Sequence, residues 1–161
     1  MRRIISLIVF FAIPIFCVSQ TDDESRLDSI LAMAGDYSDN GFLVKSDSLL
    51  NLAESLIDDN TSASSIAQLK FYTAHSHLAK WELDKAETLF EECIDFDTAA
   101  QDTLRFVAFK SGLATVKQLQ GNLIEAIQLM ESAKNMVANK DSAKYFGLMA
   151  NLGVAYDFSG R

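Results

Sequence analysis

The pattern of apolar and polar positions repeats along this chain with a period of about 40 residues, a length that occurs among helical repeats. Three series of small residues mark the period: Ala34, Ala74 and Ala114; Ser46, Ala86 and Ala126; and Ala53, Cys93 and Ala133. Gly41, Trp81 and Gly121 keep the same interval. Self-similarity of this kind is typical of solenoids, in which each unit buries its apolar face against its neighbours. The pattern therefore predicts a repeat protein.

Each unit is predicted to contain two amphipathic helices joined by a tight turn. In the first unit, apolar residues recur at three- and four-residue steps from Leu27 to Tyr37, and again from Leu49 to Ile57. Gly41 separates the two stretches, because glycine readily takes the left-handed conformation that closes a helix. Residues 58–62 are polar and rich in helix-capping types, so we expect the loop to the next unit there.

Applied along the chain, this layout predicts units at 27–66, 67–106 and 107–145 and an incomplete unit at 146–161. We expect the two helices of a unit to approach closely at Ala34, Ala74, Ala114 and Gly153. A large side chain at one of these alanines should cost about 1–3 kcal/mol by overpacking. The last helix is strongly apolar, whereas repeat arrays normally end in a polar capping helix. We therefore expect the 161 residues to be the N-terminal piece of a longer protein; the alternative is a genuine end.

Two segments resemble parts of a tetratricopeptide repeat (TPR). Gly121-Asn122-Leu123-Ile124-Glu125-Ala126, followed by Met130 and Ala133, resembles the second half of such a repeat, and Asn151-Leu152-Gly153-Val154-Ala155-Tyr156 resembles the first half. The resemblance extends over 27–161 and implies an all-α fold, a right-handed α-solenoid of antiparallel helix pairs. The chain departs from the family in three ways. Its period is about 40 rather than about 34 residues, it has no proline between units, and His77 and Lys117 replace an aromatic residue.

The same resemblance implies where a partner would bind. In TPR proteins the first helices of successive units line a concave groove for peptides. By register, the predicted partner-binding residues are Gln68, Phe71, His75, Leu78, Ser111, Thr115 and Gln118. Ala108 and, in the first unit, Asp28, Leu31, Gly35 and Ser38 hold equivalent positions. None of them is Lys or Arg, so the set differs from the clamp with which some TPR proteins hold a C-terminal carboxylate. The alternative is that they only pack or contact solvent.

The N-terminus has the pattern of a secretory signal peptide. A short basic start, Met1-Arg2-Arg3, precedes an apolar run from Ile4 to Val18, and small residues suit cleavage before Gln20. We therefore assign 1–19 to a signal peptide and 20–26 to a short linker, and expect an exported protein of the periplasm or cell envelope. The alternatives are an uncleaved membrane anchor and lipoprotein processing at Cys17.

The net charge of the chain excludes some classes of binding partner. The chain carries 22 acidic against 14 basic residues, a net charge of -8. Such a surface repels phosphate, so nucleic acid and anionic lipid are poor partners.

After removal of the predicted signal peptide one cysteine remains, Cys93, which cannot form an internal disulfide and is expected to be a small buried apolar residue.

Signatures of catalysis are absent from the sequence. No G-x-S-x-G, P-loop, H-E-x-x-H or C-x-x-C motif occurs. His75 and His77 lie two apart on a predicted helix, so they point in nearly opposite directions and cannot chelate one metal together. We expect His77 to flank the core in place of tyrosine. The sequence predicts no enzyme activity, no cofactor and no metal site.

These observations favour a protein–protein interaction module. A signal peptide followed by long-period repeats is similar to the exported sensor portion of Bacteroidetes histidine kinases and regulators, in which a membrane helix and an output domain follow. On that analogy the protein would contact a membrane only through an uncleaved signal peptide or through a C-terminal region beyond the sequence. Three alternatives stay open: a stand-alone scaffold, a non-catalytic region of an enzyme whose catalytic domain follows residue 161, and a carbohydrate-binding protein of the same helical class.

Overall fold

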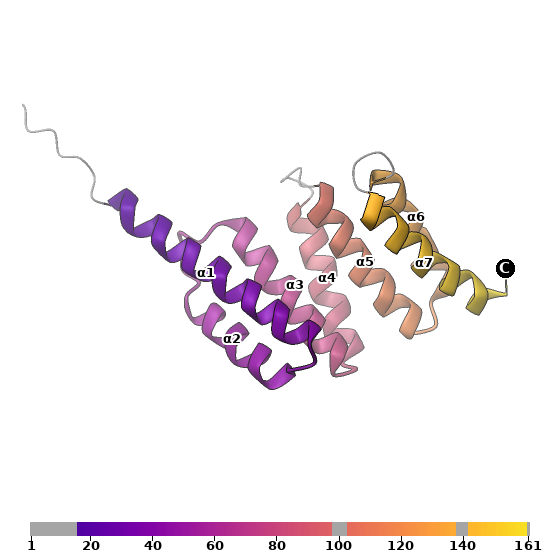
Figure 1. The fold of residues 1–161 in the computed structure, drawn as a ribbon, viewed down its shortest axis with the longest axis horizontal. Coiled ribbons are helices and arrows are strands. Elements are labelled where there is room, and N and C mark those ends of the chain that lie inside the picture. The colour runs from indigo at the N-terminus through magenta and orange to yellow at the C-terminus, as the bar shows by residue number, and fades with distance from the viewer. Residues whose placement is uncertain (1–15, 98–102, 138–141, 161) are drawn as a thin grey trace, which may run out of the picture.

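The computed structural model describes residues 16–97, 103–137 and 142–160, and within these ranges the chain forms seven helices and no strand (Figure 1). The helices are α1 (Phe16–Asp39), α2 (Leu43–Ser55), α3 (Ala63–Ala79), α4 (Leu83–Asp97), α5 (Thr103–Leu119), α6 (Leu123–Val137) and α7 (Ser142–Ser159). The second helices of the units begin at Leu43, Leu83 and Leu123, which keeps the interval of the predicted repeat.

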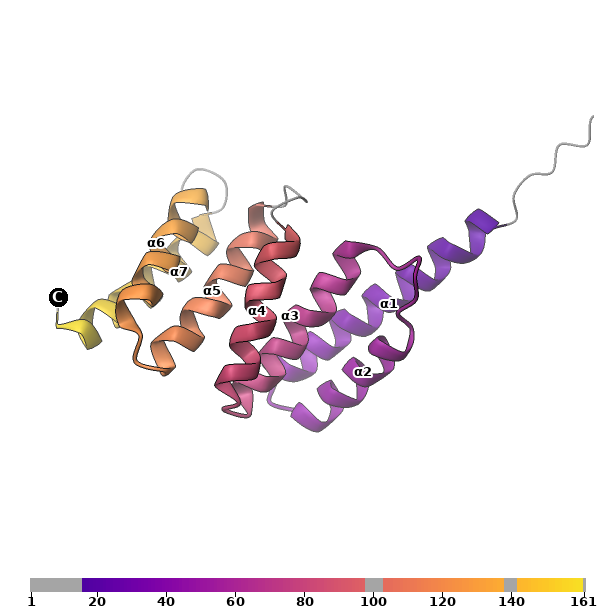
Figure 2. The ribbon, with the colours of Figure 1, turned by 180° about the vertical axis from the view of Figure 1, so that it is seen from behind.

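The helices form a single row of antiparallel pairs, which confirms the all-α solenoid. We call α1, α3, α5 and α7 the A helices and α2, α4 and α6 the B helices. The A helices α1, α3 and α5 each pack on the B helix that follows, and the B helices α2, α4 and α6 also contact the A helix of the next unit. The B helices come to the front when the molecule is turned (Figure 2). The molecule therefore has an A-helix face and a B-helix face.

The turns inside the three pairs have one geometry. Gly41, Trp81 and Gly121 follow the last residues of an A helix and have φ of 78°, 61° and 84°. The amide of the next residue donates to a carbonyl five positions back, as from Phe42 to Tyr37 at 2.8 Å. This is the hydrogen bonding of a helix end closed by a left-handed residue, as predicted at Gly41.

The predicted small residues lie in the core. Ala34, Ala74, Ala114 and the alanines and cysteine of the B helices are fully buried. Ser46 is also buried, and its hydroxyl donates to the carbonyl of Ala34 at 2.8 Å. The Cys93 thiol donates to the carbonyl of Ala67 at 3.4 Å, and the cysteine is buried as predicted. Gly153 is the exception: it is exposed, and no atom outside its own helix lies where a Cβ would stand. The described residues contain no B helix after α7, so the close approach predicted at Gly153 stays a prediction.

The unit boundaries differ from the prediction by about one helical turn. α3 begins at Ala63 and α5 at Thr103, where the sequence placed the boundaries at 66/67 and 106/107. The Ser62 hydroxyl accepts a hydrogen bond from the Ser65 amide at 3.1 Å and so caps α3 before its first apolar residue. Apolar periodicity starts one turn inside a helix, which explains the shift.

The first helix begins earlier than the apolar pattern predicted. α1 starts at Phe16 and continues through 20–26, the predicted linker, where no glycine or proline interrupts it. Most of the predicted signal peptide, residues 1–15, lies outside the described residues. In the described part of the chain, no helix has both the length and the apolar character needed to cross a membrane.

Two glycines set how neighbouring units meet. A Cβ on Gly35 of α1 would clash with the ring of Tyr72 on α3, and one on Gly112 of α5 would clash with Phe90 on α4. We call the contact between the first two units the first junction and that between the second and third units the second junction. The helices that approach closely are α1 and α3 at the first junction and α4 and α5 at the second. As a result α1 packs along α3, whereas α3 and α5 barely touch.

Candidate protein-binding surfaces

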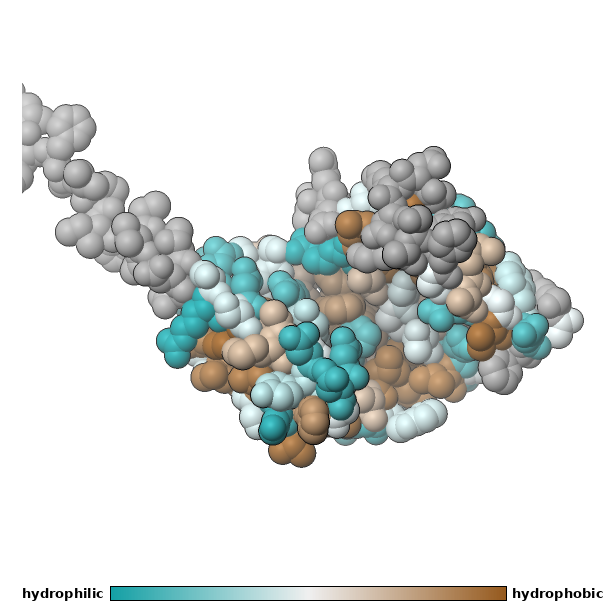
Figure 3. All heavy atoms as spheres, viewed as in Figure 1, coloured by the Kyte–Doolittle hydropathy of each residue, from teal (hydrophilic) through white to brown (hydrophobic). Residues whose placement is uncertain are grey.

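The predicted partner-binding residues lie on the A helices, and all seven are half-buried. Four are on α3 (Gln68, Phe71, His75 and Leu78) and three on α5 (Ser111, Thr115 and Gln118). The A-helix face is hollowed in its middle, between α1 and α5, and hydrophobic and polar residues are intermingled on it (Figure 3). The fold thus brings these residues to neighbouring helices of one face.

The aromatic members of the set also serve the packing between units. The Phe71 ring lies 4.5 Å from that of His75 and 5.3 Å from that of Phe109, measured between centroids, and His75 lies 5.2 Å from Phe90. Burial lowers the pKa of His75 below its ordinary value of 6.5, against a smaller opposing effect of Asp39. A neutral imidazole among aromatic rings suits packing, so binding at these two positions would use only their exposed edges.

A hollow lies between α5 and α7 at predicted positions. It measures about 260 Å³ and is lined by Val107, Ala108, Ser111, Gly147, Leu148 and Asn151. Ala108 and Ser111 are positions that the TPR register assigned to a groove. Their small side chains leave room for a side chain of a partner, and the exposed Asn151 amide offers both a donor and an acceptor.

The equivalent positions of the first unit do not all face a groove. Leu31 is 0% exposed and packs in the core with Leu27 and Leu50. Gly35 is buried beneath the Tyr72 ring. Packing inside the first unit buries Leu31, and the ring of Tyr72 on α3 covers Gly35, so the groove predicted at these two positions is wrong.

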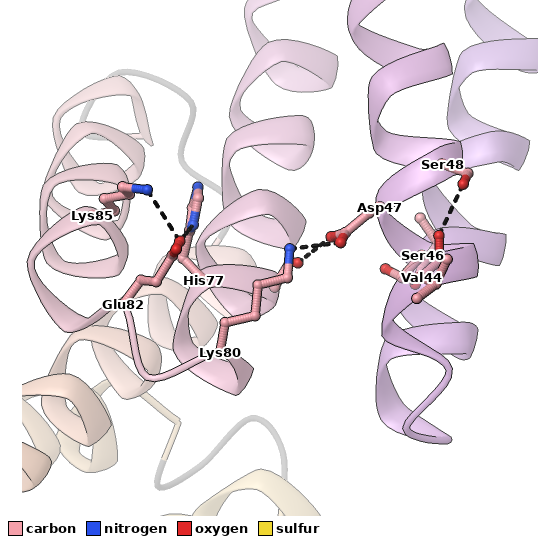
Figure 4. A network of polar contacts seen from close by, with 10 residues as sticks. Val44, Ser46, Asp47, Ser48, His77, Lys80, Glu82 and Lys85 are labelled. Atoms are coloured by element: carbon pink, nitrogen blue, oxygen red, sulfur yellow. Dashed lines mark hydrogen bonds and ion pairs between the residues drawn. The ribbon is translucent and has the colours of Figure 1, made fainter.

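The residues that replace an aromatic residue in the middle units carry ion pairs. His77 is half-buried, and its Nδ1 lies 2.5 Å from Glu82 Oε2, while Glu82 also pairs with Lys85 at 3.3 Å (Figure 4). Lys117 is buried and contacts Glu87 at 2.5 Å and Glu125 at 3.2 Å. Among the described residues, no group of three His, Cys, Asp or Glu side chains could hold a metal ion.

An acidic residue in the first turns of a B helix ties it to the next A helix. Asp47 accepts a hydrogen bond from Ser76 at 2.5 Å and pairs with Lys80 at 2.6 Å (Figure 4). One unit later, Glu87 accepts from Lys117 at 2.5 Å and from Gln120 at 2.6 Å. We call these contacts the junction clamps.

The clamps lower the pKa of both carboxyl groups. Hydrogen bonds from Lys117 and Gln120 lower the pKa of Glu87. For Asp47, burial raises the pKa, but the bonds from Lys80 and Ser76 outweigh it and the net shift is downward. Sequence analysis missed the clamps, although a signal was present: the spacing from the acid to a later polar side chain is the same at Asp47/Lys80 and Glu87/Gln120.

A larger groove opens on the B-helix face, between α2 and α4. It measures about 610 Å³, and α3 forms its floor. Apolar side chains line it (Leu50, Ile57, Ile66, Leu69 and Leu89), together with polar ones that include Asn51, Glu54, Thr73, Lys70, Lys80 and Glu92. We call it the B-face groove. No pattern in the sequence indicated it, because it depends on the distance between two units.

Comparison with known proteins bears on the fold. No protein-family model and no curated protein matches the sequence. The structure is similar to that of a Podosopora anserina protein described as a kinesin light chain with nearly identical TPR-like repeats, with a TM-score of 0.69 and 20% identity over 85% of this chain and 68% of that chain. It is also similar to BtubC (BKLC) from P. vanneervenii, with a TM-score of 0.69 and 19% identity over 87% of this chain and 58% of that one. The fold is that of TPR-like repeat proteins. At this level of identity the similarity extends to the fold alone.

Proposed function

We propose that this chain is a protein-interaction scaffold that binds a peptide segment of a partner along its A-helix face. The observation that carries the proposal is the hollow between α5 and α7, which lies at positions that the repeat register assigns to a groove. Solenoids of stacked helices present extended surfaces of this kind to partners. The TPR-like fold and the absence of catalytic motifs from the sequence point in the same direction.

A matched pair of tryptophan variants tests the binding face. The probes are short peptides selected from a displayed random library on the full chain. Ser111→Trp would fill the hollow, whereas Ser48→Trp adds the same ring on α2. Both serines donate to the carbonyl four residues back, at 2.8 and 2.9 Å, so the substitutions are alike locally. We expect S111W to weaken the affinity for the selected peptides at least tenfold and S48W to change that affinity less than twofold. Equal binding by both variants would contradict the A-helix site.

We also propose that the protein is exported and forms the sensor part of a longer signalling protein. The signal-peptide pattern of residues 1–19 supports export, and the apolar character of α7 supports a continuation. Loss of residues 1–19 would leave the buried Leu27 within α1.

Two measurements test these parts of the proposal separately. Intact mass of the protein from the envelope fraction of its own cells should show an N-terminus at Gln20; a chain that retains Met1 in the cytoplasmic fraction would refute export. The gene beyond Arg161 should encode further helices, an apolar stretch of about 20 residues and an output domain. A stop codon there would leave a stand-alone scaffold instead.

A further inference from the structure

The B-face groove results from the way the first two units meet. The contact of Gly35 with Tyr72 draws α3 toward α1, and α2 and α4 make no extensive contact with each other. A groove remains open over α3 between these two B helices. Its volume, about 610 Å³, lies within the range of ligand-binding clefts. Ile57, Leu69 and Leu89 are half-buried there, so apolar surface stays accessible in the groove.

Two ion pairs across the groove allow its length to be estimated. Lys70 on α3 bonds Glu92 on α4 at 2.5 Å, and Lys80, which follows α3, bonds Asp47 on α2 at 2.6 Å. The spacing of the two lysines in the sequence corresponds to about 15 Å along a helix. Both lysines are paired with acids of the walls, so the groove presents no net positive charge from its floor.

The lining of the groove carries more acidic than basic groups. Three carboxylates line it, Asp47 and Glu54 on α2 and Glu92 on α4. Lys80 and Lys70 pair with Asp47 and Glu92. Glu54 is exposed and forms no ion pair with the described residues, so the lining keeps a net negative charge. An occupant that carries positive charge beside its apolar surface would complement these walls.

We propose that the B-face groove binds an amphipathic helix of a partner protein, with an apolar stripe flanked by Lys and Arg. A stretch of about 15 Å accommodates apolar side chains at i, i+3, i+4 and i+7, the spacing with which helices bind grooves. A helix satisfies its own backbone hydrogen bonds, which an extended segment could not do against apolar walls. Bound there, it would pack beside helices as every element of this fold does. This site is separate from the A-helix site.

The test uses the full chain and three synthetic peptides of about 14 residues, long enough for a helix that spans the groove. The first has Leu at i, i+3, i+4 and i+7 and Lys at most other positions. The second has the same composition with Leu scattered around the helix, and the third has Glu in place of Lys. Fluorescence anisotropy of labelled peptides at physiological salt should give the first at least a tenfold tighter Kd than either of the others. Equal binding of the first two would show simple charge attraction and overturn the proposal.

Two pairs of variants locate the site. Thr73→Trp fills the floor of the groove, and Thr88→Trp places the same ring on an exposed site of α4; both threonines donate to the carbonyl four residues back, at 2.9 and 3.0 Å. Glu54→Lys reverses a charge in the groove, and Glu91→Lys reverses an exposed one outside its lining.

We expect the affinity for the first peptide to fall at least tenfold in T73W and about threefold in E54K. In the controls T88W and E91K this affinity should stay within twofold of that of the original chain. If T73W and T88W, both folded by circular dichroism, bind alike, the groove is not the site. Should T73W fail to fold, the comparison of E54K with E91K decides: equal affinities would contradict the proposal. S111W serves as an A-helix control and should leave this peptide unaffected.

Discussion

The second residue after the A helix of each of the three pairs adopts a left-handed backbone, and two of the three pairs use glycine there. Trp81 takes the same conformation with φ of 61°, although L-residues with a Cβ lose roughly 1–2 kcal/mol there. The indole compensates little by burial, since Trp81 is 70% exposed. One position of the repeat thus carries backbone strain that its neighbours avoid.

Replacement of this tryptophan by glycine should stabilise the protein. We expect Trp81→Gly to raise the free energy of unfolding by about 0.5–1 kcal/mol, because relief of the strain exceeds the added flexibility of the unfolded chain. Urea denaturation followed by circular dichroism measures the change. Gly121→Ala, with φ of 84° in the parent, should lose about 1 kcal/mol as the matched opposite. A loss in W81G would mean that the indole makes a stabilising contact.

His75 should make stability depend on pH. Because burial lowers its pKa in the folded chain, the unfolded chain binds the proton more readily below the ordinary pKa of 6.5. The free energy of unfolding is therefore highest above pH 6.5 and falls as the pH drops toward the folded-state pKa of His75. This one group contributes a slope of up to about 1.4 kcal/mol per pH unit. Unfolding measured between pH 7.5 and 5 should show this slope in the parent and a flatter one in His75→Gln. Parallel curves would contradict it.

Between elements, close contacts at two glycines bring helices of neighbouring units together. Gly112 of α5 lies against the ring of Phe90, a fully buried side chain of α4. Its counterpart in the first junction is Gly35 against Tyr72. The two contacts bring different pairs of helices together, α1 with α3 in the first case and α4 with α5 in the second.

A methyl group at Gly112 should loosen the second junction. We expect Gly112→Ala to cost about 1–3 kcal/mol, because the added methyl group would clash with the fully buried ring of Phe90. Gly147→Ala, at a helical glycine with nothing near its Cβ position, should be neutral or slightly stabilising. Thermal unfolding of the two variants gives the comparison, and similar Tm values would show that α5 can shift away without cost.

At the scale of the molecule, each unit packs on its neighbours, and among the described helices no extensive contact skips a unit. The two junction clamps belong to different junctions and share no residue. Stability in such arrays is a sum of unit and interface contributions, as long as the sites are independent.

Loss of both clamps should therefore be additive. We expect Asp47→Asn and Glu87→Gln each to cost about 1 kcal/mol, and the double variant to match the sum within about 0.5 kcal/mol. Urea denaturation at pH 7 measures the three values. A deviation above about 1 kcal/mol would mean that the junctions are coupled through α3 and α4.

The sequence alone determined the helices, the turns and the buried small residues. These features depend on contacts within one unit, so their spacing along the chain is enough to predict them, from Ala34 and Ser46 to Cys93. It also placed Ala108 and Ser111 at the hollow on the A-helix face. Tertiary structure decided what lies between units: the burial of Gly35, the clamps at Asp47 and Glu87, and the groove between α2 and α4. Each of these depends on how closely two units approach, and that distance is set by single contacts such as Gly35 with Tyr72, which the period of the repeat does not encode.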